Sequence, residues 1–418
     1  MDLAKLQMTL LVLAAACLLF RRTSLYAATS YLISASVISI LWISRFPHGW
    51  DQEVYCTSQR ILNMGLDPYI TETFLQVTGV PSNLTFAYPP LAAYFFAPLC
   101  LMQSIFFPLF FLGLLAVVIF LFRNPHLENN LYLGALIFTG FAGFQWCFLT
   151  GNIGAVELFL LVLPLYLFSK KRFALMGACL GLLGFIKIHF LFYVPLVFFI
   201  KPARQKELLT PFFSGLIGTF SILQIFSLAI FPGLFSSFAE RTWSFLPFLG
   251  GMPSETGAGW HNPTLPLAVH AWASRHLPGY GTGAVVLALL LVFLLRLLRD
   301  YSRWNEKEPL KVLSFGILVF SLAFPRLKPY SLIIATLPLY LVTMGFSWKG
   351  RSWILFLGCL LPQILFLNYL PGIFTGSLHF VGGVLSPFVE IYQTMCLLLS
   401  VVFVYFMERR MGGKRLSS

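Results

Sequence analysis

The chain has 418 residues, of which 58% are hydrophobic and only 10% are charged. With a mean hydropathy of +0.83, the remaining residues are too few to cover a water-soluble surface. The formal net charge is +13, but most of the Lys and Arg residues stand in short clusters between apolar runs, which is a pattern of membrane topology rather than of nucleic-acid binding. We therefore predict an all-α, polytopic membrane helical bundle, with membrane lipids and not nucleic acid around it.

Apolar runs follow one another along the whole chain. They lie near residues 3–20, 25–45, 91–122, 131–149, 153–168, 173–200, 209–231, 283–299, 312–324, 331–346, 353–370 and 384–406. Basic clusters bracket the run at 173–200 on both sides, so we expect two short helices, broken near Lys187, in place of one crossing. A second break is predicted at "PRLKPY" (325–330), because its two prolines interrupt a helix. With these breaks, the chain forms one membrane domain over residues 1–418, with about 11 to 13 membrane helices.

Three loops then share the face opposite to the basic clusters. They cover residues 46–90, 232–282 and 371–383, and the positive-inside rule makes them extracytoplasmic. The first two are longer than a hairpin connection requires, and long loops on a rigid bundle often carry function. Of the seven cysteines, only Cys56 lies in such a loop, so no disulfide framework is expected.

The first large loop contains the most polar stretch of the chain. "DQEVYCTSQRILNM" (51–64), followed by Gly65, predicts a short helix lying on the membrane, with Gly65 as its terminator. Asp51 has two interpretations here. It is a plausible N-cap of this helix, or its carboxylate accepts a proton from an acceptor hydroxyl at the mouth of an external cavity.

Cationic residues mark both predicted breaks. Lys187 lies at membrane depth, where charges are costly and usually functional, although snorkelling from a helix end is the alternative. His189 beside it suits either a structural or a functional role. Arg326 and Lys328 in the second break suit an anionic phosphate, with lipid headgroups as the alternative partner.

Other polar residues give weaker indications. Asn152 in "TGN" (150–152), and His261 and Asn262 in "WHNPTLP" (260–266), either orient sugar hydroxyls or cap helices. Glu157, inside an apolar run, is expected to pair with a cation. Zinc, ATP and dinucleotide motifs are absent from the sequence, so we expect a reaction without metal or cofactor.

Several short motifs occur in a characteristic order. After the loop acid come "GLDPY" (65–69), "YPPL" (88–91), "GN" (151–152), "GACLGLLGFIKIHFLFYVPL" (177–196), "HNPTLP" (261–266) and the basic turn at 325–330. In this order and spacing the sequence resembles polyprenol-phosphate-dependent glycosyltransferases of the GT-C superfamily, most closely glycosyltransferase family 87 with its bacterial α-mannosyltransferases. The resemblance covers roughly residues 45–345.

The resemblance implies a GT-C-type bundle that performs an inverting transfer of a hexose, expected to be mannose. The donor would be a polyprenyl monophosphate sugar and the acceptor a lipid or glycan hydroxyl, on the extracytoplasmic face of a bacterial inner membrane. Asp51 would be the general base. The donor phosphate would be bound by Lys187, His189, Arg326, Lys328 and Tyr330, and the substrates by Tyr69, Tyr88, Asn152, His261 and Asn262.

The sequence departs from the family pattern at two of these places. Ile188-His189 follows Lys187 where the family more often has Pro, and "KPY" (328–330) stands where the family often has His-Tyr. The main alternative function is a polytopic transporter or lipid-linked glycan flippase, with charges distributed toward both faces. A ligase or polymerase that uses a diphosphate carrier and a non-enzymatic scaffold are further alternatives.

Overall fold

Helices are the only regular secondary structure in the part of the chain that the computed structural model describes. This part comprises residues 3–20, 25–45, 49–79, 86–101, 106–200, 202–244, 263–277, 282–324, 328–367 and 391–415. It contains four helices that are long and apolar enough to cross a membrane, together with seven shorter apolar helices. The prediction of an all-α polytopic membrane protein is confirmed.

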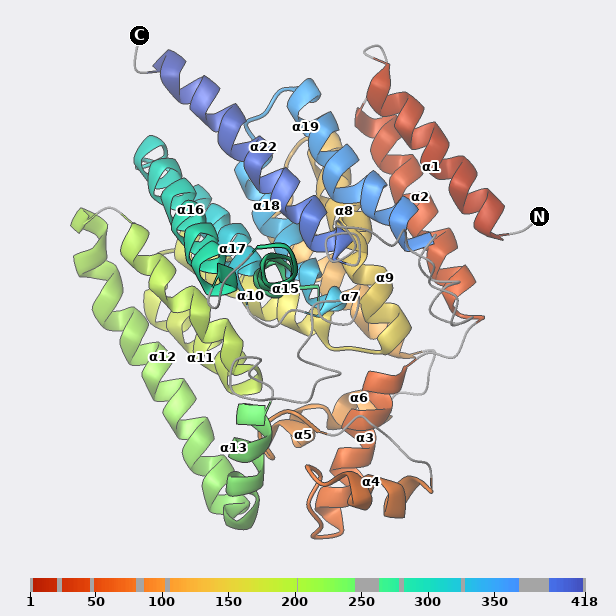
Figure 1. The fold of residues 1–418 in the computed structure, drawn as a ribbon, viewed down its shortest axis with the longest axis vertical. Coiled ribbons are helices and arrows are strands. Elements are labelled where there is room, and N and C mark those ends of the chain that lie inside the picture. The colour runs from red at the N-terminus through yellow and green to blue at the C-terminus, as the bar shows by residue number, and fades with distance from the viewer. Residues whose placement is uncertain are drawn as a thin grey trace.

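The helices follow one another in the order shown by the colours of Figure 1. The first part of the chain forms α1 (Leu3–Leu19), α2 (Leu25–Ile43), α3 (Trp50–Asn63), α4 (Thr71–Thr78), α5 (Ala92–Phe95), α6 (Ala97–Leu101), α7 (Phe106–Leu121), α8 (Leu127–Thr139), η1 (Gly140–Ala142), α9 (Gly143–Thr150), α10 (Gly154–Ser169), α11 (Phe173–Ile186) and η2 (Ile188–Phe199). The rest forms α12 (Pro202–Ile230), η3 (Pro232–Leu234), α13 (Phe235–Ser244), α15 (Leu265–His276), α16 (Thr282–Trp304), α17 (Pro309–Ala323), η4 (Pro329–Ala335), α18 (Thr336–Thr343), α19 (Trp348–Leu355), η5 (Phe356–Leu360) and α22 (Tyr392–Arg415).

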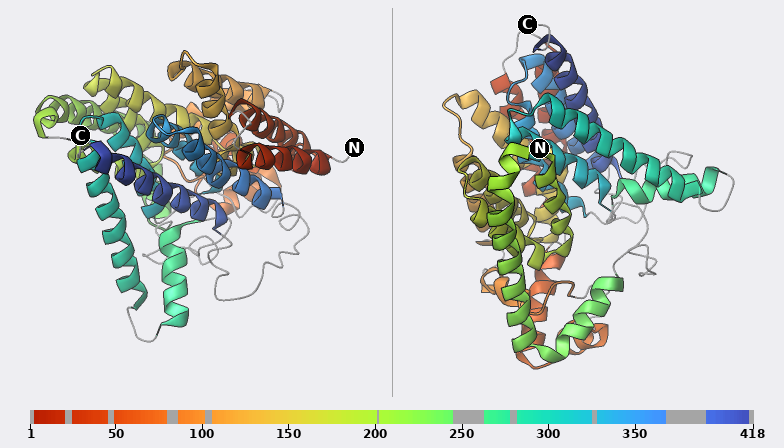
Figure 2. Two further views of the ribbon diagram at one scale, coloured as in Figure 1. Left: turned by 90° about the horizontal axis from the view of Figure 1, so that it is seen from above. Right: turned by 90° about the vertical axis from the view of Figure 1, so that its left-hand side faces the viewer.

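The short helices α3 to α6 and α13 lie together at one end of the bundle, the lower end in Figure 1. Aromatic side chains join them: the Tyr69 and Phe238 rings are 5.9 Å apart, and Tyr94 stacks on Phe231. The two segments predicted as large loops on one face therefore contact each other. At the side of the bundle, α15 and α16 pack against each other, and the end of α15 and the start of α16 project outward (Figure 2), while α16 also packs against α17 and α22.

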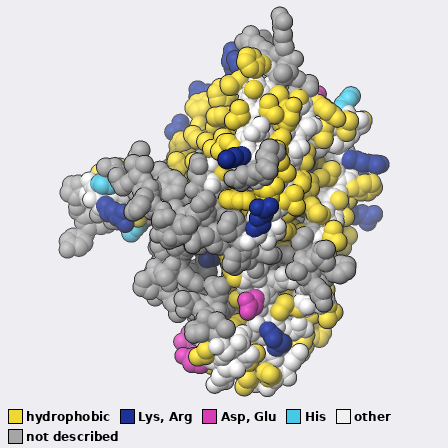
Figure 3. All heavy atoms as spheres, turned by 90° about the vertical axis from the view of Figure 1, so that its right-hand side faces the viewer, with side chains coloured by type: hydrophobic (Ala, Val, Ile, Leu, Met, Phe, Trp, Pro, Cys, Tyr) yellow, Lys and Arg dark blue, Asp and Glu magenta, His cyan; other side chains and the backbone are white. Residues whose placement is uncertain are grey.

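The surface of the bundle is apolar where lipid would cover it. On the face drawn in Figure 3, hydrophobic side chains cover most of the upper body, and carboxylates gather toward the lower end, at which Figure 1 places α3 and α4. Helix α12 exposes a row of large aliphatic and aromatic side chains, among them Ile217, Ile222, Ile225 and Phe226. Such a helix is stable in lipid and not in water.

Both breaks that the sequence predicts are present. Helix α11 ends at Ile186, and Lys187 is extended (φ −137°, ψ 102°) before the 3₁₀ helix η2 begins. Helix α17 ends at Ala323, and the 3₁₀ helix η4 begins at Pro329. The two breaks are neighbours in space, because the ring of Phe324 lies 5.6 Å from His189.

A third break was not expected from the sequence, since the apolar run at 131–149 reads as one span. Helices α8 and α9 are separated by η1, where Phe141 and Ala142 adopt positive φ angles of 52° and 53°. The freed carbonyls accept hydrogen bonds from amides of distant helices: Gln393 Nε2 donates to Phe141 O at 2.6 Å and Gln363 Nε2 to Thr139 O at 3.0 Å. A broken helix is tolerated in a bundle when neighbours satisfy its backbone in this way.

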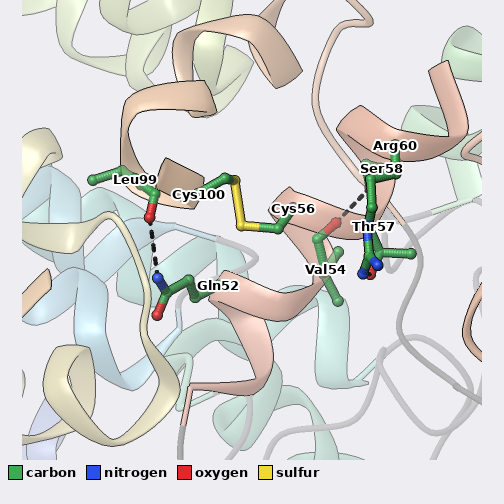
Figure 4. The surroundings of a disulfide bond; sticks show 8 residues. All are labelled: Gln52, Val54, Cys56, Thr57, Ser58, Arg60, Leu99 and Cys100. Carbon is green, nitrogen blue, oxygen red and sulfur yellow. Dashed lines mark hydrogen bonds between the residues drawn. A yellow bond between two sulfur atoms is a disulfide. The ribbon is translucent and has the colours of Figure 1, made fainter. Parts of the chain in front are cut away.

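A disulfide bond corrects the expectation from the cysteine pattern. Cys56 of α3 is bonded to Cys100 of α6, with 5.3 Å between the Cα atoms (Figure 4). The sequence-based inference was wrong because it placed Cys100 within one span at 91–122. The structure divides that run into α5, α6 and α7, so Cys100 lies among the short helices beside α3.

Candidate active site

Helix α3 begins one residue before the candidate acid. Gly49, in the left-handed conformation with φ 83°, is the N-cap, and Trp50 is the first helical residue. The interpretation of Asp51 as the N-cap is therefore wrong, because Asp51 lies inside the first turn and its side chain is free to point away from the helix. The predicted end of the helix is confirmed: Met64 is the C-cap and Gly65 follows with φ 73°.

The start of α3 is held against the end of α9. Gly49 N donates a hydrogen bond to Leu149 O at 2.9 Å. Gly151, with φ 68°, lies so close that an added Cβ would meet Gln52 Cβ and Gly49 Cα at 2.9 Å. A side chain at position 151 would be strained by its backbone conformation and would push α3 away.

Asn152 joins this junction to Asp51. Its Nδ2 donates to Asp51 Oδ2 and to the Tyr55 hydroxyl, each at 2.8 Å. Asp51 and Tyr55 are four residues apart and so lie on one face of α3. The Tyr55 hydroxyl is 3.2 Å from that of Tyr88. Asn152 is 1% exposed, and so a buried amide fixes the orientation of the carboxylate.

The surroundings of Asp51 favour a proton-accepting role. Burial raises the pKa of Asp51 above its ordinary value, while the hydrogen bond from Asn152 and the positive charges of Lys328 and Lys187 act to lower it. A carboxylate whose pKa is raised is a stronger base than an exposed one. The positive charges of the two lysines favour the ionised form of Asp51.

Lys187 lies at the first membrane break in a set of defined contacts. It forms an ion pair with Glu157 of α10, whose side chain is 1% exposed. Its Nζ is 5.6 Å from the centre of the Tyr88 ring and 5.1 Å from that of Tyr330. The expectation that Glu157 pairs with a cation is confirmed. Because the Lys187 side chain is only 10% exposed, it does not snorkel into solvent.

Residues of the second break complete the cluster. Tyr330 in η4 contacts Lys187, and its carbonyl lies 3.6 Å from Cys147 Sγ of α9. Lys328 is the N-cap residue of η4, and its positive charge acts to lower the pKa of Asp51. The structure therefore brings together Asp51, Lys187, Lys328 and Tyr330, which come from three separate parts of the chain.

The other predicted site residues have different positions. His189 lies on η2 with its ring 4.6 Å from Phe190, beside the second break. The Tyr69 hydroxyl donates to Tyr88 O at 2.6 Å, which links "GLDPY" to "YPPL". Three further candidates lie outside the described residues: Arg326, His261 and Asn262.

Tyr55 and Cys100 were not singled out from the sequence, and Cys56 was noted only as the cysteine of the first large loop. Tyr55 shares the hydrogen bonds of Asn152, and its spacing of four residues from Asp51 is the signal that would have indicated it. Cys56 and Cys100 form the bond that ties α3 to α6. The signal for Cys100 was the length of the run at 91–122, which exceeds the roughly 20 residues of one span.

The arrangement combines the buried carboxylate of Asp51 with two lysines, Lys187 and Lys328, at one end of a membrane bundle. A carboxylate held by an amide can remove a proton from a hydroxyl, and two lysines can stabilise negative charge that develops on a departing group. Fold and site together define a polytopic membrane protein with a polar site suited to transfer of a group with an anionic leaving group.

Comparison with known families agrees with this class. The model of glycosyltransferase family 87 matches residues 86–325, which is more than half of the chain. The protein belongs to glycosyltransferase family 87 and is a membrane glycosyltransferase. Comparison with curated proteins and with solved structures gives no match. The matched segment contains Tyr88, Asn152 and Lys187, whereas Asp51 and Lys328 lie outside it.

Proposed function

We propose that the protein transfers a hexose, with mannose as the expected sugar, from a polyprenyl monophosphate to an acceptor hydroxyl at the extracytoplasmic face of a cell membrane. The observation that carries this proposal is the series of contacts that links Asp51 through Asn152, Tyr55 and Tyr88 to Lys187. Membership of family 87 supports the transfer of a sugar. The anionic leaving group and the external face are inferred from the charges and from the disulfide.

The reaction follows from the charges of the three residues. Asp51 accepts the proton of the acceptor hydroxyl, and the oxygen of that acceptor hydroxyl forms a bond to the anomeric carbon. The bond from that carbon to the phosphate oxygen breaks, and the phosphodiester leaves as a polyprenyl monophosphate with one additional negative charge. Lys187 and Lys328 stabilise this charge, which is larger in the transition state than in the bound donor. Attack opposite to the leaving phosphate inverts the anomeric configuration.

The surrounding residues support this assignment through their contacts. Asn152 orients Asp51 by its hydrogen bond, and Glu157 holds Lys187 at the break between α11 and η2. Tyr88 and Tyr330 flank the Lys187 ammonium with their rings, which allows a cation to persist in an apolar surrounding. Arg326 and His189 remain candidate phosphate contacts, and Tyr69, His261 and Asn262 remain candidate substrate contacts.

The external face is supported by two features. The positive-inside rule assigns the basic clusters to the cytoplasm and α3 to the opposite side. The Cys56–Cys100 disulfide in α3 and α6 is expected to persist only in an oxidising compartment. Both features assign the Asp51 end of the bundle to the same side.

The test is an assay of sugar transfer with defined donors. Membranes containing the wild-type protein or the Asp51→Asn variant receive radiolabelled polyprenyl-phosphate hexoses, including mannose, with lipid and glycan acceptors from the host envelope. Parallel reactions contain the nucleotide sugar or a polyprenyl-diphosphate glycan. We expect transfer from a monophosphate donor by the wild type alone, with a product anomer opposite to that of the donor.

Three outcomes would contradict the proposal. Equal transfer by the wild type and Asp51→Asn removes Asp51 as the base. Direct transfer from the polyprenyl-diphosphate glycan would show that the donor is a diphosphate and not a monophosphate. Movement of an unchanged lipid-linked sugar across sealed vesicles, without product formation, favours the flippase alternative.

A further inference from the structure

The disulfide has a specific position relative to the candidate base. Cys56 lies five residues after Asp51 on the same helix, and its partner Cys100 lies in α6. Next to it, Gln52 Nε2 donates to Leu99 O at 3.2 Å. Gln52 and Cys56 are four residues apart, so they share the face of α3 that meets α6 (Figure 4).

Asp51 and Tyr55 form a second contact face of α3. These two residues are also four apart, and both meet Asn152 at the end of α9. Helix α3 is therefore held by two faces, one covalently attached to α6 and one hydrogen-bonded to Asn152. Fixing the first face fixes the rotation of the helix about its axis, and this rotation decides where the Asp51 carboxylate points.

The partner of the disulfide is itself part of the wall of the site. Helices α5 and α6 have only four and five residues, too few to be stable without tertiary contacts. Phe96 between them packs against Tyr55 at 4.7 Å and against Tyr88 at 5.1 Å between ring centres. The disulfide thus closes a ring of contacts that runs from α3 through these aromatic residues and back to α6.

We propose that the Cys56–Cys100 disulfide is a positioning element of the active site, and that the protein transfers sugar at its full rate only in the oxidised form. This inference rests on the proposed function for its catalytic consequence. Formation of the bond removes two protons and two electrons from the two thiols, and a protein disulfide in the oxidising compartment accepts them. Cys56 and Cys100 act through Asp51 and do not touch the reacting atoms.

The bond itself can be tested without substrate. The full-length protein is purified in detergent without reductant, its free thiols are alkylated, and a proteolytic digest is analysed by mass spectrometry before and after reduction. We expect a linked peptide pair that contains Cys56 and Cys100 and separates on reduction. Two alkylated thiols at these positions in the freshly prepared protein would overturn the proposal.

The catalytic consequence is tested by kinetics of single and paired variants. We expect Cys56→Ser, Cys100→Ser and the double variant to lower kcat by tenfold to a hundredfold, with KM for the donor changed by less than twofold. The double variant should equal either single variant, because each removes the same bond. Cys179→Ser, which alters a partly buried free cysteine, is the matched control and should retain the wild-type kcat.

Two measurements separate positioning from a loss of folded protein. Reduction of the wild type should lower kcat and reoxidation of the same sample should restore it, while the double variant should not respond to reductant. The acidic limb of the pH profile should also move to lower pH in the double variant, because a displaced Asp51 is less buried and its pKa falls toward the ordinary value.

The outcomes distinguish this inference from the proposed function. A double variant with the wild-type kcat and pH profile overturns the positioning role alone and leaves the sugar transfer intact. A linked peptide in a folded wild type that transfers no sugar from any donor overturns the proposed function, and the catalytic role of the disulfide fails with it.

Discussion

Two interruptions of membrane helices in this protein use different chemistry. At the break between α11 and η2, the chain carries a charged group: Lys187 pairs with Glu157 and lies between two tyrosine rings. At the break between α8 and α9, neutral amides satisfy the freed carbonyls, since Gln363 donates to Thr139 O and Gln393 donates to Phe141 O.

The comparison distinguishes what a broken helix needs in order to fold from what an active site needs in order to react. A broken helix requires hydrogen-bond partners for its backbone, and uncharged amides are sufficient. A buried ion pair is a costly alternative, because removing two charges from water offsets most of their attraction. The presence of a charge at the first break therefore points to a role beyond folding, and we propose that Lys187 binds the donor phosphate.

Replacement of Asp51 is expected to have the largest effect on kcat. Asp51→Asn keeps the shape of the side chain but removes the proton acceptor, so kcat should fall by about 10²- to 10⁴-fold, the usual contribution of a general base. Glu53→Gln is the matched control, since Glu53 is an exposed carboxylate in the same first turn. Initial rates with saturating donor measure both. A similar loss in the two variants would show that charge on α3, rather than Asp51 itself, is required.

The ion pair at the first break should affect both activity and stability. Glu157→Gln leaves Lys187 buried without its counter-ion, and breaking such a pair costs about 3–5 kcal/mol of stability. Lys187→Met should lower kcat by roughly a hundredfold, because a cation that stabilises transition-state charge is lost. Thermal unfolding and kinetics of each purified variant provide the two measurements.

The double variant sharpens this test. In Glu157→Gln/Lys187→Met neither charge remains, so the melting temperature should return toward the wild-type value while kcat remains low. Recovery of transfer in the double variant would mean that Lys187 has only a structural role.

The neutral break should affect stability alone. Gln393→Leu leaves Phe141 O without its donor, and an unsatisfied buried carbonyl costs about 1–3 kcal/mol. We expect a lower melting temperature and an unchanged kcat per folded molecule. Size-exclusion chromatography quantifies the folded fraction. A loss of kcat comparable to that of Lys187→Met would end the distinction between the two breaks.

The prediction for Asn152 concerns the pH dependence of the rate. Asn152→Ala removes a hydrogen bond that favours the ionised form of Asp51, so the pKa of this carboxyl rises further and the acidic limb of the kcat/KM profile moves to higher pH. At neutral pH the rate should fall roughly tenfold, because the carboxylate also loses its orientation. A shift to lower pH would show that Asn152 does not stabilise the charged form.

Local sequence features predicted the interruptions that have local causes. Basic clusters on both sides of the run at 173–200 revealed the break at Lys187, and two prolines revealed the break before Tyr330. Gly65 correctly marked the end of α3. These features act through backbone geometry and charge within a few residues, and so they can be read without knowledge of the fold.

Other features depend on partners far along the chain. The break at Phe141 contains neither proline nor charge, and its amide donor lies 252 residues away. Asp51 was a plausible N-cap because Asp is a common capping residue, whereas the structure has Gly49, in the left-handed conformation, at that position. Cys100 was placed within a span because hydropathy alone does not show where an over-long apolar run is divided.

The sequence by itself determined that this is an all-α membrane protein with charged breaks in two of its helices, because hydropathy, proline and charge act locally. Only the tertiary structure decided that Asp51 meets Asn152, 101 residues further along the chain, and that Lys187 pairs with Glu157. It also decided which cysteines are bonded. Such contacts arise from the packing of whole helices. Each contact joins residues of two helices that are far apart in the sequence, so neither helix specifies it alone.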